Sequence, residues 1–251
     1  MNREATGLAG VRHRKYETLG STSAEALALA RAGEHGAFWV TARTQSAGRG
    51  RRGRTWTSPP GNLYATLLLS APSPVPAAPQ LSFVTALAVH DAVAACAPAL
   101  GPALKVKWPN DILLGQAKLA GILIEGENAP DFVVAIGIGV NCTSHPPDTA
   151  YPATDLAVAG ALVTPEQLFA ALAPAMQRRL DQWQGGEGFA AIRADWLKRA
   201  AGLGLPLKVR LPEREMTGRF EGLDDSGRLL LAGEGGIIPV TAGEVFGFGS
   251  L

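Results

Sequence analysis

Four short apolar segments follow one another between residues 104 and 141, and the connections between them are short. They are Leu104–Trp108, Ile112–Leu114, Lys118–Glu125 and Phe132–Asn141. Only three residues separate Leu114 from Lys118, and the Gly115-Gln116 turn among them suits a tight connection but not the long crossover that parallel strands require. The pattern therefore predicts antiparallel neighbours within one sheet.

The rest of the first two hundred residues contains helical patterns and two more strand-like runs. Strands are predicted at Phe38–Ala42 and Leu63–Leu69. Helices are predicted at Ala24–Arg31, which Ser21-Thr22-Ser23 can cap, and at Gln80–Cys96, Pro165–Gln184 and Phe189–Ala200. This order of elements indicates a domain in which helices accompany a sheet.

The pattern of predicted elements changes after Gly202-Leu203-Gly204, from helices to short strands. Short strands are predicted beyond this point at Leu207–Leu211, Met216–Leu223, Arg228–Leu231 and Ile237–Val240. Such a pattern suits a small β-barrel. Because fewer than about fifty residues offer little core, we expect this unit to pack on the larger one. The predicted domains are residues 1–203 and 204–251.

The overall composition excludes several classes of protein. Lysine and arginine (23) nearly balance aspartate and glutamate (22), which argues against a broad nucleic-acid footprint. No apolar stretch is long enough to cross a bilayer, and the N-terminus lacks the apolar centre of a signal peptide. Cys96 and Cys142 have no metal-ligand spacing, so we expect buried thiols in a reducing cytoplasm.

Residues 48 to 54 form a dense basic run. It reads Gly48, Arg49, Gly50, Arg51, Arg52, Gly53 and Arg54. The spacing matches a dinucleotide-binding fingerprint, but the following Thr55–Gly61 contains paired prolines and cannot open the helix that this fingerprint needs. We favour a loop that closes over a phosphate-bearing small molecule, because arginine binds phosphate and carboxylate in a bidentate manner. A nucleic-acid patch and a solvated charge run stay open alternatives.

Other polar residues stand at the ends of the predicted strands. Pro109 must break the strand before it, which presents Asn110 and Asp111 either to a ligand or in an ordinary turn. Lys118 precedes a strand in which Gly121 leaves space for a ligand, although an edge lysine in solvent fits equally well. Asn141 is a structural cap or a ligand contact. The four histidines lack the spacing of a triad or metal site and are expected to be surface or structural residues, and Asp91 and Asp195 are expected to be solvated.

Five motifs in one order closely resemble the biotin protein ligases. They are Ser21-Thr22-Ser23, Thr44–Trp56, Lys107–Asp111, Lys118–Leu123 and Gly137–Asn141, and the segment after residue 204 resembles the SH3-like domain of that family. The resemblance implies an α+β fold. It would consist of a biotin/lipoate ligase-like catalytic domain, with a mixed, largely antiparallel sheet and flanking helices, and a small C-terminal SH3-like barrel.

The resemblance also implies two half-reactions. Biotin would first react with MgATP to give biotinyl-5′-AMP and pyrophosphate, and a lysine of the biotin carboxyl carrier protein of acetyl-CoA carboxylase would then displace AMP. An anionic carboxylate approaches a polyanionic triphosphate in the first step, so positive charge and Mg²⁺ are needed there. The arginine run supplies such charge, and closure of its loop would keep water from the intermediate.

The same resemblance implies residue roles. Biotin would contact Ser21, Thr22, Ser23, Gln45, Gly48, Arg49, Gly50, Arg51 and Lys118, together with the backbone of Gly121 and Leu123. The ATP or adenylate side would involve Arg49, Arg51, Arg52, Arg54, Trp56, Asn110 and Asn141. Lys118, Arg51 and Arg54 would stabilise charge during catalysis, and Asp111 would face magnesium.

Two departures from the family pattern shape further expectations. Ser23 stands where the family usually has asparagine, which would weaken one polar contact. Only about twenty residues precede Ser21, too few for the winged helix-turn-helix of operator-binding members, so no specific DNA binding is expected. A homodimer is possible. The rival functions are a lipoate protein ligase, a nucleic-acid-binding protein and a biotin-binding module without catalysis.

Overall fold

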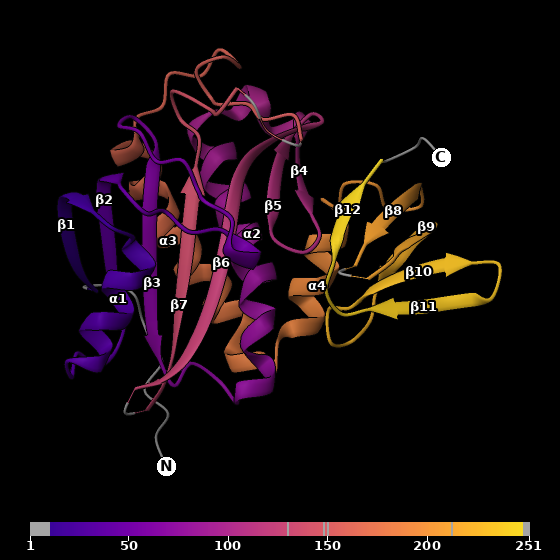
Figure 1. Cartoon of the computed structure of the whole chain (residues 1–251), viewed down its shortest axis with the longest axis horizontal. Helices are drawn as coiled ribbons and strands as arrows, with labels where there is room; N and C mark the ends of the chain where they lie inside the picture. Colours follow the sequence, from indigo (N-terminus) through magenta and orange to yellow (C-terminus); the bar gives the residue numbers. More distant parts are fainter. Residues whose placement is uncertain (1–10, 130, 148, 150, 212, 248–251) are drawn as a thin grey trace.

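A seven-stranded sheet forms the centre of the computed structural model, which describes residues 11–129, 131–147, 149, 151–211 and 213–247 (Figure 1). Its strand order is β1-β2-β3-β7-β6-β5-β4. The strands are β1 (Arg12–Leu19), β2 (Phe38–Gln45), β3 (Leu63–Ser70), β4 (Leu104–Lys107), β5 (Asp111–Leu114), β6 (Ala117–Ala129) and β7 (Asp131–Val140). The pair β1–β2 is parallel, and the other neighbours are antiparallel. The predicted antiparallel run between residues 104 and 141 is confirmed.

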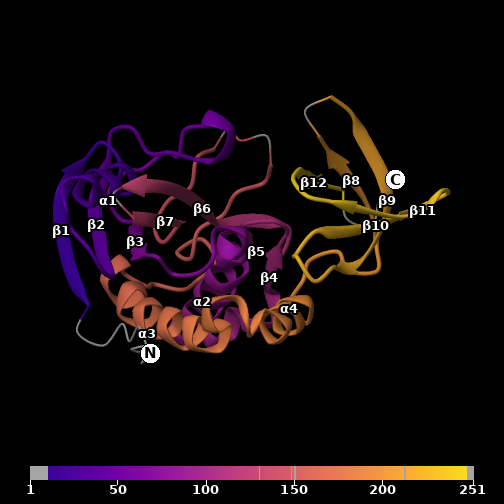
Figure 2. The ribbon, with the colours of Figure 1, turned by 90° about the horizontal axis from the view of Figure 1, so that it is seen from below.

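Helices cover both faces of this sheet. On one face lies α1 (Thr22–Arg31), and on the other lie α2 (Leu81–Cys96) and α3 (Pro165–Trp183), with α4 (Phe189–Leu197) beside them (Figure 2). The side chains of β3 alternate accordingly, since Leu67 packs on the α2 side and Leu68 on the α1 side. The expected α+β fold is confirmed.

Some boundaries differ from the predictions. The strand predicted at Leu104–Trp108 ends at Lys107, because proline at position 109 cannot continue a ladder, and the Trp108–Pro109 peptide is cis. Strand β1 was not predicted, since its charged residues give no apolar alternation. No helix in the described part of the chain is both long and apolar enough to cross a membrane.

A second, five-stranded sheet follows α4. Its order is β11-β10-β9-β8-β12, with strands β8 (Pro206–Arg210), β9 (Glu215–Leu223), β10 (Leu229–Gly233), β11 (Gly236–Val240) and β12 (Glu244–Phe246). The Trp108 indole donates to the carbonyl of Gly227 at 3.1 Å, and Phe83 and Phe189 pack against the same glycine. The second sheet therefore shares a core with the first. We propose residue 204 as the start of this second domain.

Three earlier expectations about single side chains need correction. Cys142 is buried, which raises its pKa to about 12, but Cys96 is only half-buried because it lies at the end of α2. Asp91 and Asp195 are not simply solvated. Arg179 reaches across from α3 and donates to both carboxylates, at 2.8 and 2.9 Å. Packing of three helices brings these charges together, which the pattern of a single helix does not reveal.

This network predicts an acid-dependent part of the stability. Hydrogen bonds from Gln182, Lys198 and Arg179 lower the pKa of Asp195 to about 2, against about 3.9 in an unfolded chain. A lowered pKa stabilises the fold above pH 4, and this contribution disappears as pH falls from 4 to 2. We expect Asp195→Asn to cost up to roughly 2 kcal/mol of unfolding free energy at pH 7 and little at pH 2. Urea unfolding across this range measures it; a pH-independent difference would contradict the prediction.

Candidate active site

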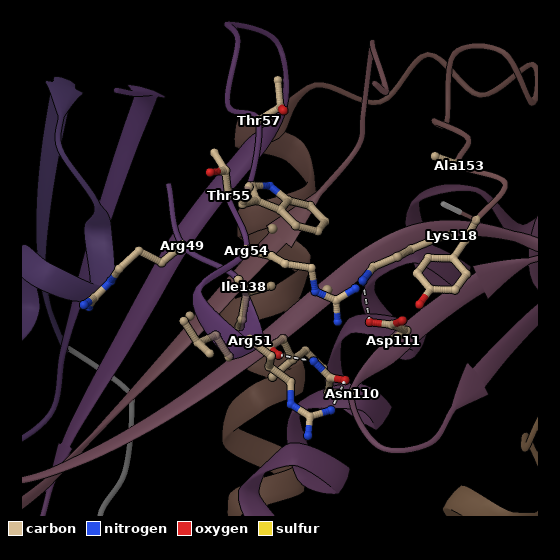
Figure 3. Close-up of a pocket in the computed structure, with 18 of the residues that line it drawn as sticks. Arg49, Arg51, Arg54, Thr55, Thr57, Asn110, Asp111, Lys118, Ile138 and Ala153 are labelled. Carbon is tan, nitrogen blue, oxygen red and sulfur yellow. Dashed lines mark hydrogen bonds and ion pairs between the residues drawn. The ribbon is translucent and has the colours of Figure 1, made fainter. Parts of the chain in front are cut away.

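A cavity of about 380 Å³ opens on the α1 face of the large sheet. Five parts of the chain surround it: the floor of β6 and β7, the N-terminus of α1, the arginine run of residues 48–54, the segment of residues 107–111 between β4 and β5, and a later group formed by the loop after β7 and the start of β12. Figure 3 shows Arg51, Arg54 and Lys118 gathered at this cavity. Segments far apart in sequence thus meet at one place.

Glycines make the floor of the cavity flat. Gly121 of β6 and Gly139 of β7 are register partners, and the indole of Trp56 lies over both. A Cβ atom added at Gly139 would stand 2.5 Å from a Trp56 ring carbon, and one at Gly121 would stand 2.9 Å away. Gly121 also pairs with Asp111 of β5, so its backbone is engaged in the sheet. Its contribution to the cavity is the space that a missing side chain leaves.

The N-terminus of α1 forms a polar wall. The Ser21 hydroxyl caps the helix by accepting from the backbone of Ala24. The side-chain amide oxygen of Gln45 accepts from the backbone nitrogen and the hydroxyl of Thr22, at 2.8 and 3.1 Å. Ser23 lies within 3.3 Å of the Thr66 hydroxyl. These buried groups hold one another in place, and Ser21, Thr22, Ser23 and Gln45 all line the cavity as expected.

Protein side chains hold the arginine run. Arg49 pairs with Glu125 at 2.9 Å, and Figure 3 shows its guanidinium turned away from Arg51 and Arg54. Arg51 donates to the side-chain oxygen of Asn110 at 3.1 Å. Arg54 forms an ion pair with Glu244 of β12. The run is therefore folded against three different elements.

Three residues of this run, Gly48, Arg52 and Gly53, lie outside the cavity lining. Arg52 is exposed, with a left-handed φ of 57° in a 3₁₀ turn (Arg51–Gly53). Gly48 is buried beneath the Trp56 carbonyl, where a Cβ atom would stand 2.3 Å from the oxygen. Gly48 thus shapes the loop by its small size, and Gly50 lines the cavity beside Arg49.

Positive charge concentrates at one end of the cavity. Lys118 pairs with Asp111 at 2.6 Å, and its ammonium lies 5.5 Å from the Trp56 ring centroid. Burial lowers the pKa of Arg51 and the pKa of Lys107. The nearby charge of Asp111 raises both pKa values but does not outweigh burial. The Lys107 ammonium lies 5.1 Å from the ring centroid of Tyr151. Such a site favours an anionic ligand that compensates the buried charge.

The two asparagines at this end have structural bonds. Asn110 donates to the carbonyl of Ile122 at 2.6 Å while it accepts from Arg51. Asn141 is buried and donates to the carbonyl of Thr154 at 3.0 Å. Both line the cavity, as does Leu123 on the floor. The cavity thus unites the expected residues apart from Gly48 and Arg52.

Asp111 and Glu244 are the carboxylates among the residues that line the cavity. No group of three or more histidine, cysteine or acidic side chains forms a metal cluster among the described residues. Mg²⁺ bound with a nucleotide does not need one, since it takes one or two carboxylates together with phosphate oxygens and water. Asp111 fits that manner of binding.

Sequence reasoning missed several residues of the site. Lys107 belongs to a quoted motif but was not singled out, although a lysine before the broken strand was the available signal. Tyr151 and Glu244 come from segments without a motif, and the Tyr151 hydroxyl donates to Glu244 at 2.7 Å. Only the folded chain brings them to the arginine run.

Comparison with known proteins gives consistent matches over this chain. Residues 21–141 match the Biotin/lipoate A/B protein ligase family, and residues 202–246 match the Biotin protein ligase C terminal domain. A Biotin--[acetyl-CoA-carboxylase] ligase of Paracoccus denitrificans is 48% identical, over 90% of this chain and 96% of the relative. One from Mycobacterium tuberculosis is 35% identical, over 90% and 85%. The solved biotin protein ligase from Aquifex aeolicus in complex with biotin and ATP has a TM-score of 0.80 at 25% identity, over 94% and 97%.

Proposed function

Because the chain belongs to the biotin protein ligase family, we propose that it activates biotin with ATP and transfers it to a lysine of the biotin carboxyl carrier protein of acetyl-CoA carboxylase. One observation carries this proposal: a flat glycine floor under Trp56 adjoins a concentrated basic end in a single cavity. A ligand with an apolar body and an acidic tail, next to a polyphosphate, satisfies both halves.

Biotin would lie against the Trp56 indole that covers the glycine floor, with its ring system toward the N-terminus of α1. The buried hydroxyls of Ser21, Thr22 and Ser23 and the Gln45 amide offer donors and acceptors for a ureido group. Ser23 has a shorter side chain than the asparagine that family members usually carry here. The carboxylate tail of biotin would then point to Lys118.

The first half-reaction would occur at the basic end. A biotin carboxylate oxygen attacks the α-phosphorus of ATP, a phosphorus–oxygen bond to the β-phosphate breaks, and pyrophosphate leaves with its electron pair. Lys118 would stabilise charge where carboxylate and phosphate meet, and Arg51 and Arg54 would bind phosphate oxygens. Mg²⁺, held by Asp111 and phosphate oxygens, would neutralise charge on the triphosphate. Asn110 holds Arg51 in position for this role.

The second half-reaction would consume the mixed anhydride. The neutral amine of the acceptor lysine attacks the biotinyl carbonyl carbon, and AMP leaves as the acyl–oxygen bond breaks. The folded arginine run and Trp56 would keep water from this intermediate until the acceptor arrives. Binding to the carrier protein, a homodimeric state, a cytoplasmic location and the lack of operator binding stay predictions.

Biotin-dependent exchange of labelled pyrophosphate into ATP tests the first half-reaction without a carrier protein. We expect exchange with biotin and Mg²⁺ but not with lipoate. Exchange with lipoate alone would reassign the chain to lipoate ligation, the rival within the matched family. A lack of exchange with either acid would leave a binding module and contradict the proposal.

Arg51→Ala should weaken retention of the intermediate. Loss of one charge-assisted hydrogen bond to a phosphate oxygen corresponds to about 1.5–3 kcal/mol. We expect biotinyl-5′-AMP to dissociate at least tenfold faster in a filter-binding chase, with Arg43→Ala as a control on an exposed arginine of β2. Equal dissociation from both variants would mean that Arg51 does not contact the intermediate.

A further inference from the structure

His145 and Asp155 form a pair behind the cavity. The ring Nδ1 of His145 lies 2.7 Å from a carboxylate oxygen of Asp155, whose side chain is 2% exposed. A carboxylate oxygen accepts hydrogen bonds, so the ring Nδ1 of His145 is placed to donate one to Asp155. The other carboxylate oxygen accepts from the backbone of Val158 at 2.7 Å. His145 itself does not line the cavity.

His145 belongs to the loop that covers the basic end of the cavity, and Asp155 directly follows this loop. We define the cover loop as residues 143–147, 149 and 151–154. It contributes Pro146, Thr149, Tyr151 and Ala153 to the cavity wall. Tyr151 links it to the basic end, because its hydroxyl donates to Glu244, the partner of Arg54, and its ring stacks near Lys107.

Backbone bonds hold the two ends of the cover loop. At the start, the Asn62 side-chain oxygen accepts from the backbone nitrogens of Thr143 and Ser144, at 3.0 and 3.3 Å. At the end, the backbone of Lys118 bonds to Pro152 and Thr154, at 2.7 and 3.0 Å. Between these ends, His145 attaches the loop to a buried charge through its side chain.

Burial of a carboxylate costs folding free energy unless hydrogen bonds compensate its charge. In the part of the chain that the structure describes, His145 is the one side chain hydrogen-bonded to the Asp155 carboxylate. Its removal would leave a buried negative charge with a backbone donor alone. The local structure would then rearrange to admit water, and the cover loop would leave its position over Lys107 and Arg54.

We infer that His145 is a positioning residue whose bond to Asp155 sets the cover loop and thereby the affinity of the site for the nucleotide. The biotin floor is built from β6, β7 and Trp56, so a shift of the loop leaves it intact. This inference rests on the proposed use of ATP by the same cavity.

Pyrophosphate exchange by His145→Ala and His145→Asn tests this role. The alanine variant should raise KM for ATP about tenfold, the size expected when a hydrogen bond to a charged group is lost, and change KM for biotin less than about twofold. The asparagine variant would carry an amide donor close to the position of Nδ1 and should restore most of the ATP affinity. Asp195→Asn is the matched control, because it breaks a carboxylate network remote from the cavity.

The outcomes separate this inference from the proposed function. An ATP-selective rise in KM that asparagine rescues, and that Asp195→Asn does not show, supports it. An unchanged KM for ATP in His145→Ala would overturn it. Equal rises in KM for ATP and for biotin would also overturn it, if they follow the loss of thermal stability in His145→Ala and Asp195→Asn alike. If the native protein shows no exchange with biotin, the proposed function fails before the role of His145 is reached.

Discussion

Lys118→Ala is expected to slow biotin adenylation by about 10²- to 10³-fold, the usual cost of removing one group that stabilises developing charge. The ammonium lies at the junction of the floor and the basic end, 2.6 Å from Asp111 and next to the Trp56 ring. Its loss would leave the carboxylate and α-phosphate to approach without compensation. Single-turnover formation of biotinyl-5′-AMP measures this step directly.

The controls for this variant separate charge from packing. Lys118→Arg should recover part of the rate, since it keeps a cation, and Lys208→Ala on β8 should behave like the native protein because that lysine is exposed on the second sheet. Transfer from synthetic biotinyl-5′-AMP to the carrier should be affected less than adenylation. If Lys118→Ala adenylates normally and only melts earlier, its role is structural.

Gly139→Ala is expected to raise KM for biotin by about 10- to 100-fold. The added methyl group would stand 2.5 Å from Trp56, so the indole must leave the floor, and overpacking of this kind typically costs about 1–3 kcal/mol. Alanine is well tolerated by the strand itself, which confines the effect to the cavity. Steady-state exchange at saturating ATP provides the measurement.

Gly101→Ala is the matched control for this substitution. A Cβ atom at Gly101 meets nothing within 4 Å, and the residue lies in a 3₁₀ helix (Pro98–Ala103) away from the cavity. Both variants carry the same added methyl group. An unchanged KM for biotin in Gly139→Ala would show that Trp56 can move without loss and that the flat floor does not bind biotin.

Local signals predicted much of the fold. The two-residue turn at Gly115-Gln116 gave the pairing of β5 with β6, and apolar runs gave β3 and β7. By contrast, β1 is a charged edge strand that pairs in parallel with β2, and α1 lies between them in the sequence. Neither an apolar pattern nor a short turn therefore predicted β1. Strand β12 has three residues, too few for any pattern.

The candidate site was predictable where it depends on short motifs. The arginine run, Lys118 and the residues before α1 do meet at one cavity. The position of Trp56 over Gly121 and Gly139 depends on how a loop folds over two strands, and the sequence assigned Trp56 only to the adenylate side. Tyr151 and Glu244 were missed because tertiary structure alone brings residues 93 positions apart into a hydrogen bond.

The partners of the arginine run have a consequence for ligand binding. Glu125 holds Arg49, Glu244 holds Arg54, and the Asn110 oxygen holds Arg51. Oxygen atoms of the protein therefore already neutralise or accept from these guanidiniums, and on the proposed function they would compete with ligand oxygens for them. If these arginines bind the anion as proposed, it would exchange one acceptor for another, and little conformational entropy would be lost in ordering a free chain. Release of the anion would then return each arginine to its protein oxygen.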